Sequence, residues 1–420
     1  MRKISISAVV FIYCLLLIVP VKAEEVKEAR VEDRYSKILV ISKAVEALGK
    51  IGNPKSRDVL VKALKSKEFL IRASAAQALG RIQDKESIPI LEGLVNDKNY
   101  LVRVLATGAL VELGEDKMKG PFLAFLKDND PKLRAIAVEA MQDMAEDVER
   151  LKEELLFSIT EMLPNEKDYI VKAKAIKVIG YNKYAPALDY VNQAINDTYA
   201  DVRNEACIAA GEIGDKGSLP LLLKRLEDES LLVRAAAKEA LGKFGDRSQI
   251  KLFWKEIDEE NSLLKAGSYI ALAYLGELDI LPVLLREIIA AENPLIIRKQ
   301  TAKALVQLKP HISDRIYELL EEKETLSILL LNNIQFDYRV EGENLISIIT
   351  QALGDENNPL HQDAPIILKE LKSKLALPAL REALLQGNPV FVARVAYVLG
   401  ELKDKEATEY LYKVLKEYGI

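Results

Sequence analysis

One pattern recurs at a nearly constant spacing along this 420-residue chain, and this period is the feature that most constrains its fold. Aligned on Arg234, equivalent markers fall at Ile41, Arg72, Arg103, Arg134, Lys172, Arg203, Lys265 and Arg298, with weaker matches at Leu329, His361 and Val392. The step between markers is constant except for three longer ones, from Arg134 to Lys172, from Lys265 to Arg298 and from Leu329 to His361. A fixed period of this length predicts a solenoid, in which each repeat packs mainly on its neighbours.

Each copy of the pattern predicts two antiparallel helices. Small residues stand three and six positions after the marker, and larger apolar residues usually stand seven and ten positions after it. This spacing places them on one helical face, where the small residues allow a neighbouring helix to approach closely. A shorter helix precedes the longer one and often carries proline near its start, as in Leu219-Pro220, where the missing N–H has no partner to lose.

The pattern L-P-x-L…L-x-D-x…V-R-x-x-A-A-x-A-L-G-x-x-G-D, seen in residues 219–246, resembles HEAT repeats, especially the short variety found in phycobilisome lyases. The resemblance covers residues 35–420 and implies an architecture, not an activity. We therefore expect an all-α fold, a right-handed α-α superhelix of about twelve HEAT-like helix pairs forming one elongated body. Residues 310–359 are less regular, and they are either a binding insertion, with a loop at 335–343, or a loosened consensus.

An acidic residue lies six positions before the basic marker in seven consecutive copies. The pairs are Asp97/Arg103, Asp128/Arg134, Glu166/Lys172, Asp197/Arg203, Asp228/Arg234, Glu259/Lys265 and Glu292/Arg298. Such a row of charges could form a track for anions. HEAT repeats are similar in carrying an Asp/Arg ladder through the stack, so we interpret the pairs as structural ties between the inter-helix turn, the next helix and its neighbour.

The N-terminal segment 1–23 has the three parts of a secretory signal peptide. Basic residues precede an apolar run to Val21, and Val21-Lys22-Ala23 satisfies the small-residue cleavage rule. We expect a mature start at Glu24, followed by a charged lead-in at 24–34, and a location in the periplasm or cell envelope of a bacterium. The alternative is a retained membrane anchor, since the apolar run is at the short limit for a span.

Charge and composition narrow the functional classes. Removal of residues 1–23 leaves 56 basic and 64 acidic side chains, a formal charge near −8, which argues against nucleic acid as a partner. The two histidines, His311 and His361, have no second metal ligand at helical spacing. Because no phosphate loop, nucleophile elbow or zinc pattern is present, the sequence predicts no catalytic residue, metal or cofactor.

The predicted binding surface lies on the longer helices, which line the concave side in this repeat type. Positions five and nine after the marker point away from the core, and the middle of this ridge carries the candidate partner-binding residues Tyr181, Ile208, Glu212, Ile270 and Tyr274. Exposed aromatic residues beside charges are typical of protein-binding surfaces. The resulting hypothesis is a non-catalytic scaffold or adaptor that binds a protein or peptide. The alternatives are a lyase-like or hydroxylase-like enzyme or enzyme subunit, and a structural envelope component.

Overall fold

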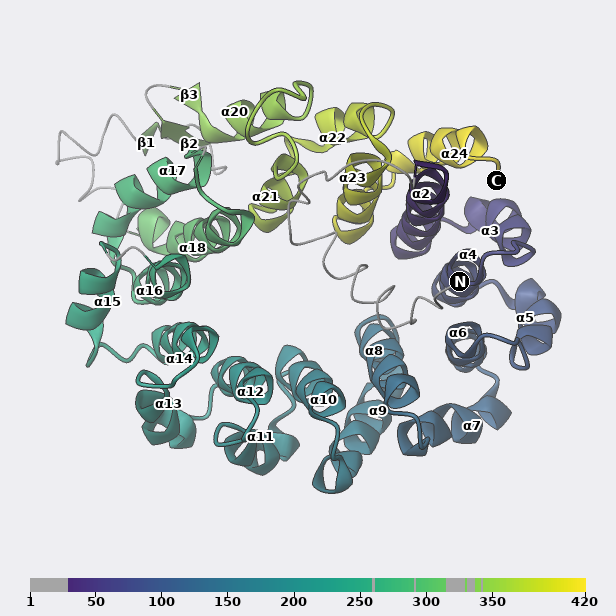
Figure 1. Ribbon diagram of the computed structural model, residues 1–420, viewed down its shortest axis with the longest axis horizontal. Helices are drawn as coiled ribbons and strands as arrows, with labels where there is room; N and C mark the ends of the chain where they lie inside the picture. Colours follow the sequence, from purple (N-terminus) through teal and green to yellow (C-terminus); the bar gives the residue numbers. More distant parts are fainter. Residues whose placement is uncertain (1–28, 259–260, 291, 315–328, 331–336, 341–342) are drawn as a thin grey trace.

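The computed structural model describes residues 29–420 except 259–260, 291, 315–328, 331–336 and 341–342. The predicted signal peptide (1–23) and residues 24–28 of the lead-in lie outside the described residues. Residues 29–34 of the lead-in belong to the first described helix, which begins at Ala29. The described residues form two layers of helices around a common axis, an inner layer and an outer layer (Figure 1).

The inner layer contains the longer helix of each pair except two, in which the outer and inner helices have 14 and 13 residues and 8 and 7 residues. Its eleven described helices are α2 (Ala29–Ile51), α4 (Phe69–Arg81), α6 (Tyr100–Glu112), α8 (Pro131–Asp147), α10 (Tyr169–Tyr181), α12 (Ala200–Ile213), α14 (Leu231–Lys243), α16 (Ser262–Tyr274), α18 (Leu295–Asp314), α21 (Ala364–Glu370) and α23 (Pro389–Glu401).

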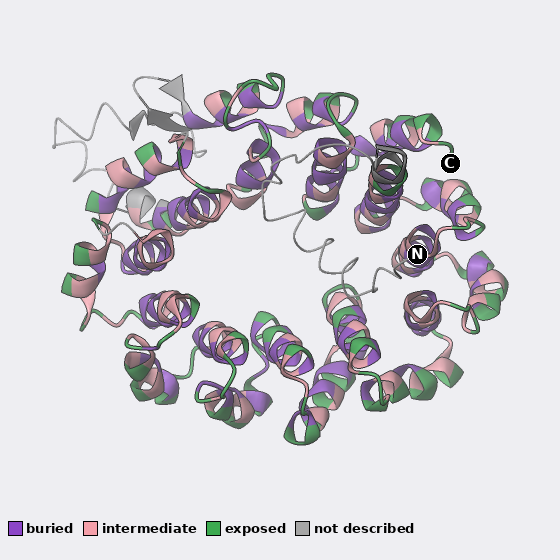
Figure 2. Cartoon of the chain, in the orientation of Figure 1, coloured by how far each residue is buried: buried purple, intermediate pink, exposed green. Residues whose placement is uncertain are grey.

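The outer layer contains the other helix of each pair, in most pairs preceded by a 3₁₀ turn. They are α3 (Arg57–Leu64), α5 (Ile88–Leu94), α7 (Lys119–Ala124), α9 (Glu149–Met162), α11 (Leu188–Ala194), α13 (Leu219–Arg225), α15 (Ile250–Glu256), α17 (Leu281–Ile289), α20 (Leu345–Ala352), α22 (Leu377–Ala383) and α24 (Ala407–Glu417). Buried residues gather on the inner helices and on the inward sides of the outer ones (Figure 2).

The structure confirms the predicted α-helical solenoid of paired helices. One interruption lies in the irregular region 310–359, where β1 (Leu329–Leu330), β2 (Asp337–Val340) and β3 (Glu343–Asn344) form an antiparallel sheet in that order. The expected loop at 335–343 therefore includes a strand, consistent with the β-propensity of Tyr338 and Val340. The marker at Leu329 falls in this sheet, so the described residues contain eleven pairs.

The two ends of the solenoid meet, and the expected elongated body is a closed ring (Figure 1). Inner helix α23 packs along α2 as extensively as consecutive inner helices pack on each other elsewhere. Outer helix α24 packs on α2 as outer helices do on their own inner partners. The eleventh pair is therefore composite, because its outer helix comes from the C-terminus and its inner helix from the N-terminus.

The closure uses the same glycine–alanine contact as the other inner-helix interfaces. A Cβ atom added to Gly400 of α23 would lie 2.8 Å from Cα of Ala47 in α2. The equivalent contact between α10 and α12 joins Gly180 to Ala209, at 2.5 Å. The same arrangement occurs at Gly49/Ala78, Gly80/Ala109, Gly211/Ala240 and Gly242/Ala271. Small residues thus set the close spacing of inner helices on both sides of the junction.

Charged contacts link successive repeats on the turns between layers. Arg203 donates to both carboxylate oxygens of Asp228 in the next repeat, at 2.8 and 2.9 Å, and to the main-chain oxygen of Asp197, at 2.9 Å. Arg72/Asp97 and Arg134/Glu166 repeat this bidentate pairing. The carboxylate of the acid six positions before the marker therefore accepts from the arginine of the preceding repeat. The main-chain oxygens of Asp97 and Asp228 also accept from the markers of their own repeats, Arg103 and Arg234.

Among the described residues, the ladder continues across the irregular region from α18 to the start of α21. Arg298 of α18 pairs with Asp363, just before α21, and Arg394 of α23 lies 3.9 Å from the same carboxylate. His361 does not extend the ladder through Asp355 as a marker would. Its buried ring stacks on Phe391, with centroids 4.1 Å apart, and its Nδ1 lies 3.0 Å from the carbonyl of Ala352.

We expect Gly400→Val to destabilise the protein, because the added side chain meets the backbone of Ala47 across the closure. Overpacking of this kind costs about 1–3 kcal/mol. Gly93→Val on α5 is the matched control, since a Cβ there meets nothing within 4 Å. Thermal unfolding of both variants checks this. An equal melting temperature for Gly400→Val and wild type would contradict the closure contact.

Arg203→Ala should cost about 3–5 kcal/mol, because it leaves the Asp228 carboxylate buried without its main cation. Arg247→Ala is the control, since its ion pair with Glu277 is more exposed and such pairs contribute about 0–1 kcal/mol. Denaturant unfolding of both variants gives the comparison, and equal losses would contradict a structural ladder.

The stability of the wild-type protein should also depend on pH through the Asp228 carboxylate. Burial would raise the pKa of Asp228, but the hydrogen bonds from Arg203 and from the Ser230 N–H outweigh it and hold the pKa below its ordinary value. This stabilisation is present above the unfolded pKa of about 4 and is lost as pH falls through the lower folded pKa. Arg203→Ala should therefore show a weaker loss of stability in acid than wild type.

Candidate functional site on the inner face

The predicted surface residues do not form one patch, although four of the five are at least partly exposed. Tyr181 on α10 is 56% exposed, and Ile208 and Glu212 on α12 and Tyr274 on α16 are intermediate. Ile270 was predicted to be exposed but is buried, so this prediction is wrong. It lies one turn after Gly267, whose close approach to Ala235 brings this side of α16 against α14.

Glu212 and Tyr274 are joined through a residue that the prediction omitted. Lys243 on α14 donates to Glu212 at 2.6 Å and to Glu239 at 2.8 Å. Its ammonium also lies 5.5 Å from the centre of the Tyr274 ring, within range of a cation–π interaction. Charges and an aromatic ring thus connect three consecutive inner helices, α12, α14 and α16.

Tyr181 instead belongs with acidic residues of α8. Its hydroxyl hydrogen-bonds the Glu146 carboxylate, and burial followed by the charge of Glu146 raises the pKa of Tyr181 to about 12. Glu401 of α23 and Lys50 of α2 also influence the pKa of this hydroxyl. Lys403, just after α23, lies 3.7 Å from Asp147 of α8, so the two sides of the ring approach each other here. Tyr181 and Tyr274 are therefore parts of separate sites.

A closure cluster joins α2 to α23 beneath this region, and consists of Lys43, Glu46, Lys50, Tyr397 and Glu401. Lys43 donates to Glu46 at 2.7 Å, and Lys50 contacts both Glu46, at 3.2 Å, and Glu401. Both ammonium groups lie over the Tyr397 ring, 5.3 and 5.5 Å from its centre. Burial would raise the pKa of Glu46, but Lys43 and Lys50 lower it to about 2.

Helix α8 carries an acidic sector, defined as Asp143, Glu146 and Asp147. Arg81 of α4 spans past α6 to contact Asp143 at 3.0 Å and Asp147 at 3.1 Å. Burial raises the pKa of Asp143 despite the opposing charge of Arg81. Burial also raises the pKa of Glu146. Arg81 is therefore shared among more carboxylates than one cation can neutralise.

Glu112 of α6 lies beneath Arg81 and is the most perturbed acid of this group. Burial raises its pKa to about 8; Arg81 opposes the shift, and Asp147 and Asp143 add to it. One carboxyl oxygen is buried without a hydrogen-bond partner and contacts the position of a Gly80 Cβ. The side chain is therefore held as a neutral acid near pH 7.

A basic sector lies on other inner helices and consists of Lys177 on α10, Lys299 and Lys303 on α18, and Lys369 on α21. Glu370 lies 3.2 Å from Lys369 and 3.8 Å from Lys299. Within the described residues, no carboxylate lies within 4.0 Å of Lys177 or Lys303. Burial lowers the pKa of Lys299; Glu370 opposes this, and Lys303, Lys369 and Lys177 lower it further.

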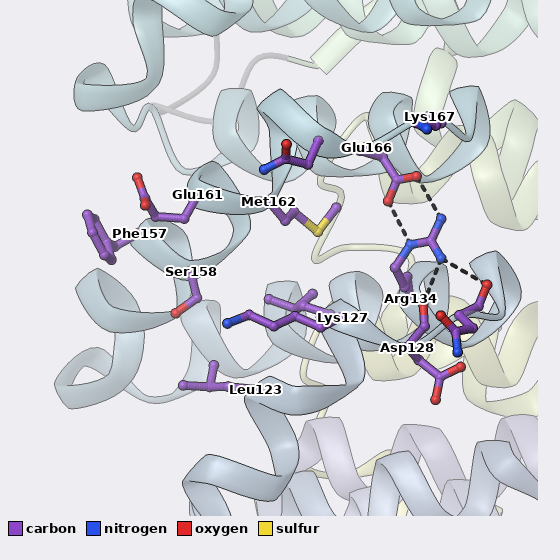
Figure 3. Close-up of a pocket in the computed structure, with 13 residues that line it drawn as sticks. Leu123, Lys127, Asp128, Arg134, Phe157, Ser158, Glu161, Met162, Glu166 and Lys167 are labelled. Carbon is purple, nitrogen blue, oxygen red and sulfur yellow. Dashed lines mark hydrogen bonds and ion pairs between the residues drawn. The ribbon is translucent and has the colours of Figure 1, made fainter.

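The outer layer contains a pocket of about 780 Å³ between α7 and α9. The sequence signal for it was the long step from Arg134 to Lys172, which reflects a 14-residue α9 where α11 and α13 have 7 residues. Figure 3 shows Phe157 and Glu161 at one end and the Arg134–Glu166 ion pair at the other. Phe157 is 56% exposed, so an apolar ring is open to solvent at the end of the pocket opposite the ladder pair.

The described residues contain no group of three or more His, Cys, Asp and Glu side chains arranged to hold a metal. Cys207 is buried and is the free cysteine of the described chain, as expected from its place on the packed side of α12. None of the described helices is both long enough and apolar enough to cross a membrane.

A family model for HEAT repeats matches residues 36–110, 156–242 and 188–273. No curated protein matches the sequence significantly.

Among solved structures, YibA of Escherichia coli is similar at 20% identity, over 69% of this chain and 99% of that chain, with a TM-score of 0.41. Yeast importin-β (Kap95p) is 14% identical over 91% of this chain and 64% of that chain, with a TM-score of 0.40. The phycocyanin lyase complex of CpcE and CpcF from Nostoc sp. PCC7120 is 19% identical over 64% of this chain and 94% of that chain, with a TM-score of 0.32. No functional residue is transferred from these structures.

We expect Glu112→Gln to stabilise the protein above pH 5. The unfolded chain releases the Glu112 proton near pH 4.3, whereas the folded state holds it to about pH 8. The contribution of Glu112 to the stability of the wild-type protein therefore falls as pH rises from about 4.3 to about 8. Glu112→Gln has no proton to lose in this range, so it should not show this fall in stability.

The gain at pH 8 should be about 1–3 kcal/mol and should vanish at pH 4. Chemical unfolding across this range gives the measurement, with Glu149→Gln as the control because its carboxylate is exposed. A gain that is equal at pH 4 and pH 8 would show that Glu112 is not held neutral.

Proposed function

Because this chain is built from HEAT repeats, we propose that it is an exported, non-catalytic scaffold that binds a protein or peptide partner on the inner face of its ring. The observation that carries the proposal is the convergence of charged and aromatic side chains on that face. Acidic residues of α8, Tyr181 of α10 and lysines of α18 and α21 come from distant parts of the sequence. Mixed charge around exposed aromatics favours a protein partner.

Ring closure strengthens this proposal in physical terms. Four inner helices, α2, α4, α12 and α14, have a glycine–alanine contact on both sides, and closure gives α2 its second one, so these helices are held in place before a partner binds. A preorganised surface loses less conformational entropy on binding than a flexible one. The acidic and basic sectors also lie on different helices, which suits a partner that presents both charges in a fixed order.

Export is part of the proposal and rests on the N-terminal sequence. Basic Arg2 and Lys3, the apolar run and Val21-Lys22-Ala23 favour cleavage after Ala23. N-terminal sequencing of protein purified from the envelope of its source bacterium should find Glu24 first. An intact Met1 in the membrane fraction would contradict cleavage and would show that the N-terminal segment is retained as a membrane anchor.

Tyr181→Ala should reduce partner capture by about tenfold, as expected for an exposed aromatic at an interface. The measurement is a pull-down from envelope extract with residues 24–420 as bait. Leu375→Ala is the matched control, because Leu375 is 58% exposed and follows α21 outside the candidate site. Equal capture by both variants and wild type would contradict binding at Tyr181.

The two alternative functions predict different results in two further measurements. Stoichiometric metal in the purified mature protein would favour an enzyme of the lyase-like or hydroxylase-like kind. Self-association in analytical ultracentrifugation, with no captured partner, would favour a structural component of the envelope.

A further inference from the structure

Among the described residues, the four lysines of the basic sector have one carboxylate within 4.0 Å, that of Glu370. Lys299 and Lys303 are one turn apart on α18, so their ammonium groups share one helical face. Lys369 comes from the neighbouring inner helix α21. Glu370 is the one described carboxylate within 4.0 Å of Lys299, and it also contacts Lys369.

Lys177, on α10, adds to the positive charge that acts on Lys299. Helices α10 and α18 stand on different sides of the axis, yet the charge of Lys177 lowers the pKa of Lys299 (Figure 1). Burial raises the pKa of Glu205 on α12 above its ordinary value, and the charge of Lys177 opposes this shift without cancelling it. Glu205 therefore does not act as a strong counter-charge for the sector.

Like charges one turn apart destabilise a helix, and partial burial adds to the cost of each ammonium group. An anion placed among the four lysines would offset both effects. We infer that the basic sector binds an acidic peptide segment, whose carboxylates bridge α18 and α21 and reach toward Lys177. The inference rests on the proposed function and specifies the chemistry of the partner.

The overall charge of the protein favours a peptide over a nucleic acid. The chain has a formal charge of −5, and a polyanion with a charge on every nucleotide needs a long basic surface to offset its repulsion. The basic sector offers four lysines, and the acidic sector of α8 faces the same inner space. A segment with a few acidic side chains satisfies the lysines without contacting the acidic sector.

The direct test is the binding of a fluorescent ten-residue glutamate peptide to the full mature chain at low salt, followed by anisotropy. Lys299→Glu with Lys303→Glu should weaken binding by at least about tenfold. Lys251→Glu with Lys255→Glu is the matched control, because these exposed lysines have the same spacing and lie on outer helix α15. The control should bind within about twofold of wild type.

Circular dichroism establishes that each variant is folded. Lys177→Glu provides a second test if the double substitution fails to fold, because Lys177 is exposed and has no close ion pair with a described residue. It should also weaken binding severalfold. Absence of binding to wild type, equal loss in the control, or no loss in either inner-face variant would overturn the inference. So would tighter binding of a ten-nucleotide single strand than of the peptide at the same basic sector.

The test separates this inference from the proposed function. Capture of a Tyr181-dependent partner that is unaffected by Lys299→Glu with Lys303→Glu would leave the scaffold proposal intact and overturn the acidic segment. Peptide binding that depends on the lysines, without any captured partner, would support the acidic site and contradict the scaffold proposal.

Discussion

The close approach of neighbouring inner helices is the constraint on which the rest of the structure depends. At six interfaces a glycine of one helix lies against an alanine of the next, and a Cβ on that glycine would overlap the neighbour. Repetition of this contact gives these six interfaces a similar close spacing, as expected where each repeat packs on its neighbours. At Gly400 and Ala47 the same contact joins the last inner helix to the first, and the solenoid becomes a ring.

Closure of the ring removes the need for capping repeats at the two ends of the solenoid. In an open solenoid the end repeats need polar outer faces, because one side of each lacks a neighbour. Here α24 and α2 complete one another, and the Tyr412 hydroxyl lies 3.1 Å from the Ser56 hydroxyl across the junction. Charges of the closure cluster then surround Tyr397, so that the junction is also part of the inner face. Stability of the ring and composition of the candidate site are therefore linked.

The repeat pattern predicts the helix pairs but not their closure. Arg234 and its equivalents located the inner helices, and the long step after Arg134 located the extended α9. Closure could nevertheless have been suspected from Ala47 and Gly400. They occupy the positions that form the glycine–alanine contact in repeats with a neighbour on each side, although they stand in the first and last inner helices. Ile270 was misplaced because the contact of Gly267 with Ala235 is local to α16. The influence of Lys177 on the pKa of Lys299 depends on the curvature of the whole ring, which no local pattern specifies.

The most direct test of the account is the distance between α3 and α24, measured by pulsed electron resonance between spin labels at Asp58→Cys and Glu409→Cys. Both positions are exposed, whereas native Cys207 is buried and should not be labelled. A closed ring predicts one narrow, short-distance population that Gly400→Val broadens and Gly93→Val leaves unchanged. A long and broad distribution in wild type would show that the solenoid is open and that the inner face is not assembled as described.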